Sequence, residues 1–95
     1  MNYQLKALPL FERQFKKFFP KEQEIIRKEI KKIQSNPALA ELKKGALSSV
    51  RVHKFKIHHQ LYLLAYEQDN KEKTIYFYAM ATHENYHTAL QRYLK

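Results

Sequence analysis

Residues 51–82 read RVHKFKIHHQLYLLAYEQDNKEKTIYFYAMAT, and the fold class can be predicted from the strands of this stretch. In the segments 48–59 and 74–82, apolar side chains alternate with polar or aromatic ones, which is the period-two pattern of a β-strand. Residues 60–68 form a nearly continuous apolar run that is typical of a central strand. The charged sequence DNKEK then predicts a hairpin turn. The stretch therefore predicts three strands that follow one another as a meander.

The residues before this stretch predict one strand and two helices. Phe11, Phe15 and Phe18 recur at helical spacing after Pro9, and Ile26, Ile30 and Ile33 form the apolar stripe of a second helix. The expected elements are an edge strand at 3–8, helices at 8–19 and 21–35, a connector at 38–49 with an optional short helical turn, and a short amphipathic helix at 85–95.

This order predicts an α+β fold, β-α-α-β-β-β-(α), in a single domain spanning residues 1–95. We expect a small, antiparallel-rich sheet with the two N-terminal helices packed on one face. The opposite face is expected to stay partly open, so its side chains are the functional candidates.

Composition narrows the class of protein. The chain has 95 residues, is 44% hydrophobic and contains no cysteine, which excludes disulfides and thiolate chemistry. It has no apolar run long enough for a membrane span and no signal-peptide pattern, so we expect a cytoplasmic protein. A net charge of +9 favours a polyanionic partner, such as nucleic acid, an acidic lipid surface or an acidic protein. A merely solubilising surface is the alternative.

Alternation along residues 51–59 places basic side chains on the open face. If Phe55 and Ile57 face the helices, then Lys54, Lys56 and His58 project from the other side. Such lysines can bind phosphate, or they can simply protect an exposed strand from aggregation.

Two further features bear on this face. Val50 and Val52 share the parity of the lysines, so a β-bulge near His53 is one way to keep them in the core. Tyr76 and Tyr78 alternate with apolar residues and could line the open side as stacking partners for bases. Their alternative role is that of ordinary strand-forming residues.

The C-terminal segment contains the letters of a zinc-protease motif. His83, Glu84 and His87 fit H-E-x-x-H, which on a helix can hold zinc. His83, however, directly follows the last predicted strand, and no His, Asp or Glu follows His87 as a third ligand. The pattern therefore favours a site without metal and a protein without a cofactor.

The chain resembles the RelE/ParE superfamily of bacterial type II toxins in four stretches. These are the opening LPLFERQFKK, the predicted strands RVHKFKI and QLYLLAYE, and the late HEN-Y. The resemblance covers essentially the whole chain. It implies a toxin with a cognate antitoxin. Because the net charge of this chain is +9, we expect that antitoxin to be acidic. RelE-like members are endoribonucleases that cut mRNA on the ribosome without a metal, and ParE-like members poison DNA gyrase.

The resemblance also implies site residues. Lys54 and Lys56 match the lysine pair of RelE-like enzymes, His83 matches the late basic residue, and Tyr86 matches the late aromatic. Arg51 is a further candidate for a phosphate contact. The expected RNA-binding residues are thus Arg51, His58, Tyr76 and Tyr78.

The middle strand departs from the RelE pattern. RelE-like enzymes usually carry an arginine there, whereas this chain has Gln60 and Leu63 in that region. Arg51, His58 or His59 could compensate for it. The alternatives are a ParE-like gyrase inhibitor without nuclease activity and a degenerate member that only binds an antitoxin.

Overall fold

The computed structural model describes residues 3–42 and 50–82. The elements are β1 (Gln4–Ala7), α1 (Pro9–Lys16), α2 (Pro20–Ser35), the short 3-10 helix η1 (Pro37–Leu39), β2 (Glu41–Leu42), β3 (Arg51–Ile57), β4 (Gln60–Asp69) and β5 (Thr74–Thr82). This order confirms the predicted α+β fold. The predicted C-terminal helix at 85–95 lies outside the described residues. In the described part of the chain, no helix is long and apolar enough to cross a membrane.

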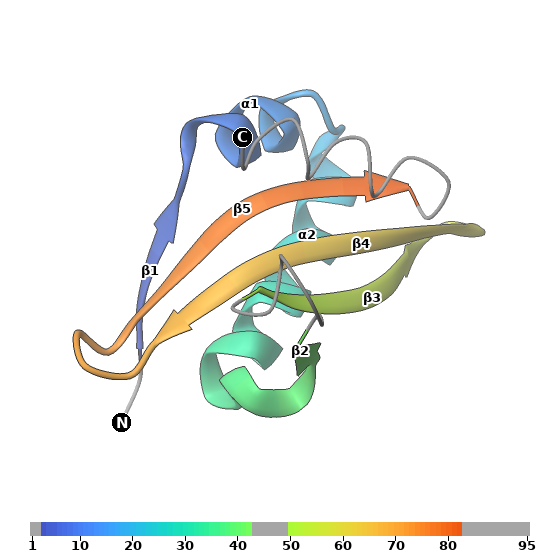
Figure 1. Cartoon of the computed structure of the whole chain (residues 1–95). Coiled ribbons are helices and arrows are strands. Elements are labelled where there is room, and N and C mark those ends of the chain that lie inside the picture. The colour runs from blue at the N-terminus through green and yellow to red at the C-terminus, as the bar shows by residue number, and fades with distance from the viewer. Residues whose placement is uncertain (1–2, 43–49, 83–95) are drawn as a thin grey trace.

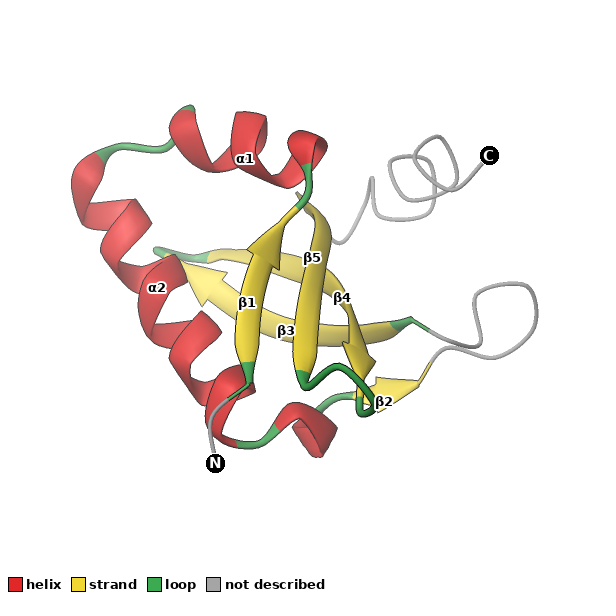
Figure 2. Ribbon diagram, turned by 90° about the vertical axis from the view of Figure 1, so that its left-hand side faces the viewer, coloured by secondary structure: helices red, strands yellow, loops and turns green. Residues whose placement is uncertain are grey.

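The strands form one sheet in the order β1-β5-β4-β3-β2. The pairs β2–β3, β3–β4 and β4–β5 are antiparallel, whereas β1 pairs with β5 in parallel. Figure 1 shows β3, β4 and β5 as long, curved neighbours, and Figure 2 shows how strongly the sheet twists between β1 and β3. The expected edge strand at the N-terminus is confirmed.

Both helices pack on the same face of the sheet, as predicted (Figure 2). Phe11 of α1 and Ile26 and Ile33 of α2 are buried there. They belong to one core cluster with sheet residues Phe55, Ile57, Leu64, Tyr66, Ile75, Phe77 and Met80. Burial of these large apolar side chains is the main force that holds the helices on the sheet. We call this side of the sheet the helix face and the opposite side the second face.

Proline and glutamate define where α2 begins. Pro20 is its first residue, a position where the missing N–H costs nothing. The backbone N–H of Phe19 donates a hydrogen bond of 3.0 Å to Glu22 Oε1 in the first turn. The carboxylate thus sits at the positive end of the helix dipole.

The expected bulge near His53 is wrong, because β3 pairs with β4 in continuous register from Arg51 to Ile57. The irregularity lies instead between Ala65 and Tyr66, where β4 meets β5. Val50 needs no bulge, since it is buried on the second face with Leu63 and Ala65. The two-residue strand β2 was not predicted, whereas η1 supplies the short helical turn foreseen for the connector region.

Candidate nucleic-acid interface

Strand alternation brings a mixed set of side chains to the second face. The register and the packing clusters assign to it Gln4 and Lys6 of β1, Val52, Lys54 and Lys56 of β3, Leu61, Leu63, Ala65, Glu67 and Asp69 of β4, and Thr74, Tyr76, Tyr78, Ala79 and Ala81 of β5. Four of the eight residues predicted from the sequence to form the site, namely Lys54, Lys56, Tyr76 and Tyr78, thus share one face.

Lys54 and Lys56 stand at one end of this face. They lie opposite Leu63 and Leu61 of β4, and both lysine side chains are exposed. Within the described residues, neither ammonium group has a hydrogen bond or an ion pair. No carboxylate of the described residues therefore neutralises these two positive charges.

The centre of the second face is apolar and buried. Val50, Leu63 and Ala65 are 2–4% exposed and form a cluster of their own, against which Val52 and Tyr78 pack. The sequence led us to expect a partly open platform across the whole face. The lysine end and the tyrosine end are instead separated by this apolar centre.

The carboxylate of Glu67, which was not predicted from the sequence as a site residue, lies at the other end of the face. Tyr78 donates a hydrogen bond of 2.6 Å to Glu67 Oε1, and the side chains of both residues are half-buried. Glu67 is also the direct register partner of Tyr76. In turn, the Lys6 ammonium lies 6.0 Å from the centre of the Tyr76 ring. The only signal in the sequence was the parity of Glu67 with Leu63 and Ala65.

Arg51 lies on the helix face and is not brought together with the lysines. Its register partner is the buried Tyr66, and its Nη1 donates a hydrogen bond of 2.7 Å to the Ala40 carbonyl. The Tyr66 hydroxyl donates a bond of 2.7 Å to the Pro37 carbonyl. Burial raises the pKa of Tyr66, and the nearby Arg51 charge opposes this only in part. Both side chains thus anchor the segment around η1.

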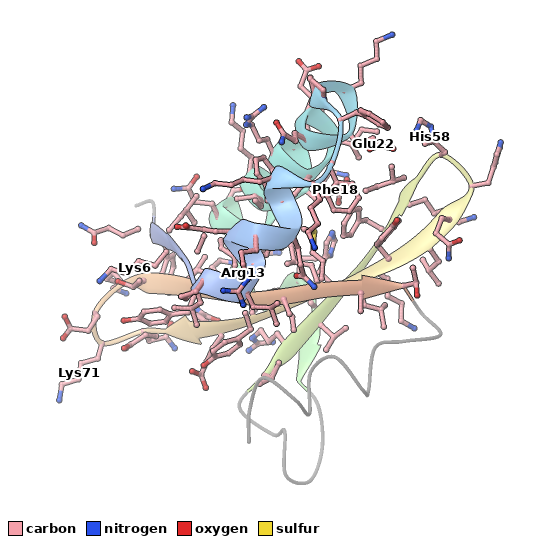
Figure 3. All side chains as sticks on the ribbon, turned by 90° about the horizontal axis from the view of Figure 1, so that it is seen from above. Lys6, Arg13, Phe18, Glu22, His58 and Lys71 are labelled. Carbon is pink, nitrogen blue, oxygen red and sulfur yellow. The ribbon has the colours of Figure 1, made fainter. Side chains whose placement is uncertain are left out.

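The His58 side chain points toward the helices and not to the face of the lysine pair. It occupies the β3–β4 turn with a φ of 57°, in the left-handed region, so the alternation of β3 no longer sets its direction. Its Nε2 is 3.3 Å from Glu22 Oε2 at the start of α2. Figure 3 shows His58 at the hairpin tip on the side of Glu22. The pair links the hairpin to the helices.

His53 faces α2 and forms a compact charged group with it. Its Nε2 lies 2.7 Å from Glu29 Oε1, and Lys32 Nζ donates to Glu29 Oε2 at 3.1 Å. Burial raises the pKa of Glu29, but the hydrogen bonds and charges of His53 and Lys32 outweigh it, so the pKa lies below its ordinary value. Among residues 3–42 and 50–82, no group of three His, Asp or Glu side chains could hold a metal ion.

His83 and Tyr86, predicted for the catalytic site, lie outside the described residues. The same holds for the rest of the H-E-x-x-H segment. β5 runs to Thr82, the residue immediately before His83, as the sequence predicted for the end of the last strand. Of the four predicted catalytic residues, Lys54 and Lys56 therefore lie within the described part of the chain.

The fold is similar to that of solved RelE toxins. The RelBE2 toxin–antitoxin complex from Mycobacterium tuberculosis matches with a TM-score of 0.75 at 13% identity, over 86% of this chain and 99% of that chain. A double mutant of the E. coli toxin RelE in the free state matches with a TM-score of 0.71 at 18% identity, over 97% and 98%. The toxin of the intact E. coli RelBE complex gives a TM-score of 0.68 at 15% identity, over 83% and 94%.

Sequence comparison identifies the family. Among curated proteins, no sequence matches the chain significantly. A family model described as the ParE-like toxin of type II bacterial toxin–antitoxin systems matches residues 5–91, which is nearly the whole chain. The fold, the basic strand β3 and this match agree with one another. The chain therefore belongs to the ParE-like toxins of the RelE/ParE superfamily and is a toxin of a type II toxin–antitoxin system.

Proposed function

We propose that this toxin inhibits translation by cutting mRNA on the ribosome. The reaction is an attack of the ribose 2′-hydroxyl on the adjacent phosphate, without a metal ion. The 2′-O–P bond forms and the P–O5′ bond breaks, while the 2′-hydroxyl proton passes to a base and the departing 5′-oxygen takes up a proton. The products carry a 2′,3′-cyclic phosphate and a 5′-hydroxyl.

The observation that carries this proposal is the lysine pair on β3. Lys54 and Lys56 are exposed, point to the same side of the sheet and have no carboxylate partner in the described residues. The phosphorane-like transition state gains negative charge on its non-bridging oxygens. Two preorganised ammonium groups stabilise that charge more than the charge of the ground state, which is the condition for catalysis.

Proton transfer is assigned to residues that follow β5 in the sequence. His83 is the candidate acid or base, since an imidazole titrates near neutral pH. Tyr86 is the candidate for orienting or stacking the substrate. Tyr76 and Tyr78 complete the proposed RNA contacts, whereas Arg51 and His58 are left out because each is engaged elsewhere in the fold.

A second function, poisoning of DNA gyrase without cleavage, is supported by strand β4. The side chains that β4 presents to the second face are Leu61, Leu63, Ala65, Glu67 and Asp69, and none of them is a cation. The face thus lacks the middle-strand arginine that RelE-like enzymes usually have. A toxin that works through protein contacts would not need that charge.

The proposed partner in the cell is an acidic antitoxin. Two of the similar structures are RelBE toxin–antitoxin complexes. With a net charge of +9, this chain would associate fastest with a partner of opposite charge. The proposed place of action is the cytoplasm, where translating ribosomes are found.

Primer extension on translated mRNA tests the proposal. The toxin is added to a translation reaction, and the mRNA is mapped for cuts in the ribosomal A site. New cuts that require ribosomes support the nuclease. Intact mRNA together with gyrase-linked DNA breaks would refute the nuclease and support the gyrase function. Intact mRNA with intact DNA would contradict both functions.

A further inference from the structure

Three side chains form a row across the end of the second face that lies away from the lysine pair. In the register, Lys6 of β1 pairs with Tyr76 of β5, and Tyr76 pairs with Glu67 of β4. Register partners on neighbouring strands point to the same side of the sheet, and in an antiparallel pair such as β4–β5 their Cβ atoms are about 4.5–5.5 Å apart. A cation, an aromatic ring and a carboxylate therefore stand side by side on three adjacent strands.

Glu67 is unusual for its surroundings. In a chain with 18 lysines and arginines, it has no basic partner within the described residues. Its side chain is half-buried, and Oε1 accepts a hydrogen bond of 2.6 Å from the Tyr78 hydroxyl. This bond fixes the direction of the carboxylate, and no described group occupies Oε2. A carboxylate held in this way repels phosphate and favours a neutral N–H donor.

We propose that Lys6, Tyr76 and Glu67 form a nucleotide-binding subsite that selects bases with an exocyclic amino group. Tyr76 stacks on the base, Lys6 contacts the adjoining phosphate, and Glu67 accepts a hydrogen bond from the amino group. Tyr78 is a positioning residue that acts through Glu67. The substrate class, single-stranded RNA, rests on the function proposed above.

The subsite lies away from the bond that is cut. Along β4, Glu67 is four residues beyond Leu63, the register partner of Lys54. At about 3.3 Å per residue, this separation is roughly 13 Å along the strand. The subsite therefore reads a nucleotide other than the one whose phosphate lies between the lysines. It gives the toxin a base preference at a fixed distance from the cut.

Cytosine and uracil provide the sharpest comparison, because they have the same size and differ mainly in the 4-amino group of cytosine. Short 2′-O-methyl oligomers of each base cannot be cleaved, so their equilibrium binding to the purified toxin is measured directly. We expect the cytidine oligomer to bind roughly tenfold more tightly than the uridine oligomer. Glu67→Gln should bring this ratio close to one, because an amide both donates and accepts.

Matched variants separate the three roles. Glu67→Asp keeps the negative charge but moves it away from the base, so this variant should also lose the preference for cytidine. Glu72→Gln, in the β4–β5 turn, should keep that preference. Tyr76→Ala should weaken both oligomers alike. Lys6→Ala should reduce the salt dependence of binding, and Lys71→Ala, a change in an exposed turn lysine, should not. Figure 3 shows Lys6 on the sheet and Lys71 at the hairpin.

The subsite would be overturned by equal binding of the two oligomers to the wild type, by an absence of binding to either, or by an unchanged ratio in folded Glu67→Gln. Its failure is distinct from failure of the proposed nuclease. A cytidine preference without ribosomal cuts would support the subsite and refute the nuclease. Ribosomal cuts without the preference would support the nuclease and refute the subsite.

Discussion

The side-chain amide of Gln14 completes the hydrogen bonding of Met80 at the edge of the sheet. Its Nε2 donates to the Met80 carbonyl and its Oε1 accepts from the Met80 N–H, both at 2.7 Å. β1 pairs with β5 only as far as Phe77, so the later part of β5 has no neighbouring strand on that side in the described structure. Gln14 thus takes the place of a peptide group from a further strand and ties α1 to the sheet.

Replacement of Gln14 by leucine should destabilise the fold. The change leaves the N–H and C=O of Met80 without partners in a part-buried position, at a cost of about 1–3 kcal/mol in the free energy of unfolding. Urea unfolding measures it. Gln4→Leu is the matched control, because Gln4 is exposed and its side chain makes no hydrogen bond in the described residues. It should change stability by no more than about 0.5 kcal/mol. Equal effects of the two changes would contradict the role of Gln14.

Glu29 should make the fold sensitive to acid. Its pKa is lowered in the folded protein from the ordinary value of 4.5, so its contribution to stability is fully present above that value. As the pH falls through the folded pKa, the carboxylate is protonated and this contribution is lost. Glu29→Gln should lower stability at neutral pH by about 1–2 kcal/mol and should flatten the decline below pH 4.5.

Unfolding in urea at several pH values tests the contribution of Glu29. Glu24→Gln provides the control, because Glu24 is an exposed residue of α2 whose side chain makes no hydrogen bond or ion pair in the described structure. A decline with acid that is as steep in Glu29→Gln as in the wild type would show that the ionised Glu29 carboxylate does not stabilise the fold.

Tyr66 should make the fold sensitive to alkali. Burial raises its pKa above 10.0, so the unfolded chain ionises first and stability is lost as the pH rises from 10.0 through the folded pKa. Tyr66→Phe removes this loss. It also leaves the Pro37 carbonyl without its hydrogen bond, which should cost about 1 kcal/mol near pH 7. Tyr62→Phe, which removes no described hydrogen bond, should change neither the loss of stability at alkaline pH nor the stability near pH 7. Thermal unfolding measures both.

The elements with strong local patterns were predictable from the sequence. β5 spans Thr74–Thr82, the predicted range, because alternation and the charged turn before it define its start. α2 begins one residue earlier than predicted, at Pro20, which opens this helix as well as ending the preceding one. Alternation along each strand also predicts that Lys54 and Lys56 share one face of β3 and that Tyr76 and Tyr78 share one face of β5.

Features that depend on contacts across the fold were not predictable. The positions of Val50 and Val52 depend on Leu63 and Ala65, which fill the centre of the second face. The bulge lies where β4 meets β5, and no glycine or proline marks it in the sequence. A turn with positive φ redirects His58 toward α2. Glu67 was overlooked because nothing local distinguishes a lone glutamate near a strand end.

The rates at which the wild type and Lys54→Ala cut ribosome-bound mRNA show whether the lysine pair of β3 is catalytic. Lys54 is proposed to stabilise the transition state, so its loss should lower the rate at saturating toxin by about 100-fold or more, as for other electrostatic groups of this kind. Lys71→Ala, which removes an exposed lysine of the β4–β5 turn, should cut at the wild-type rate. Equal rates for Lys54→Ala and the wild type would rule out a catalytic role for Lys54, and no ribosome-dependent cuts by the wild type would rule out the nuclease.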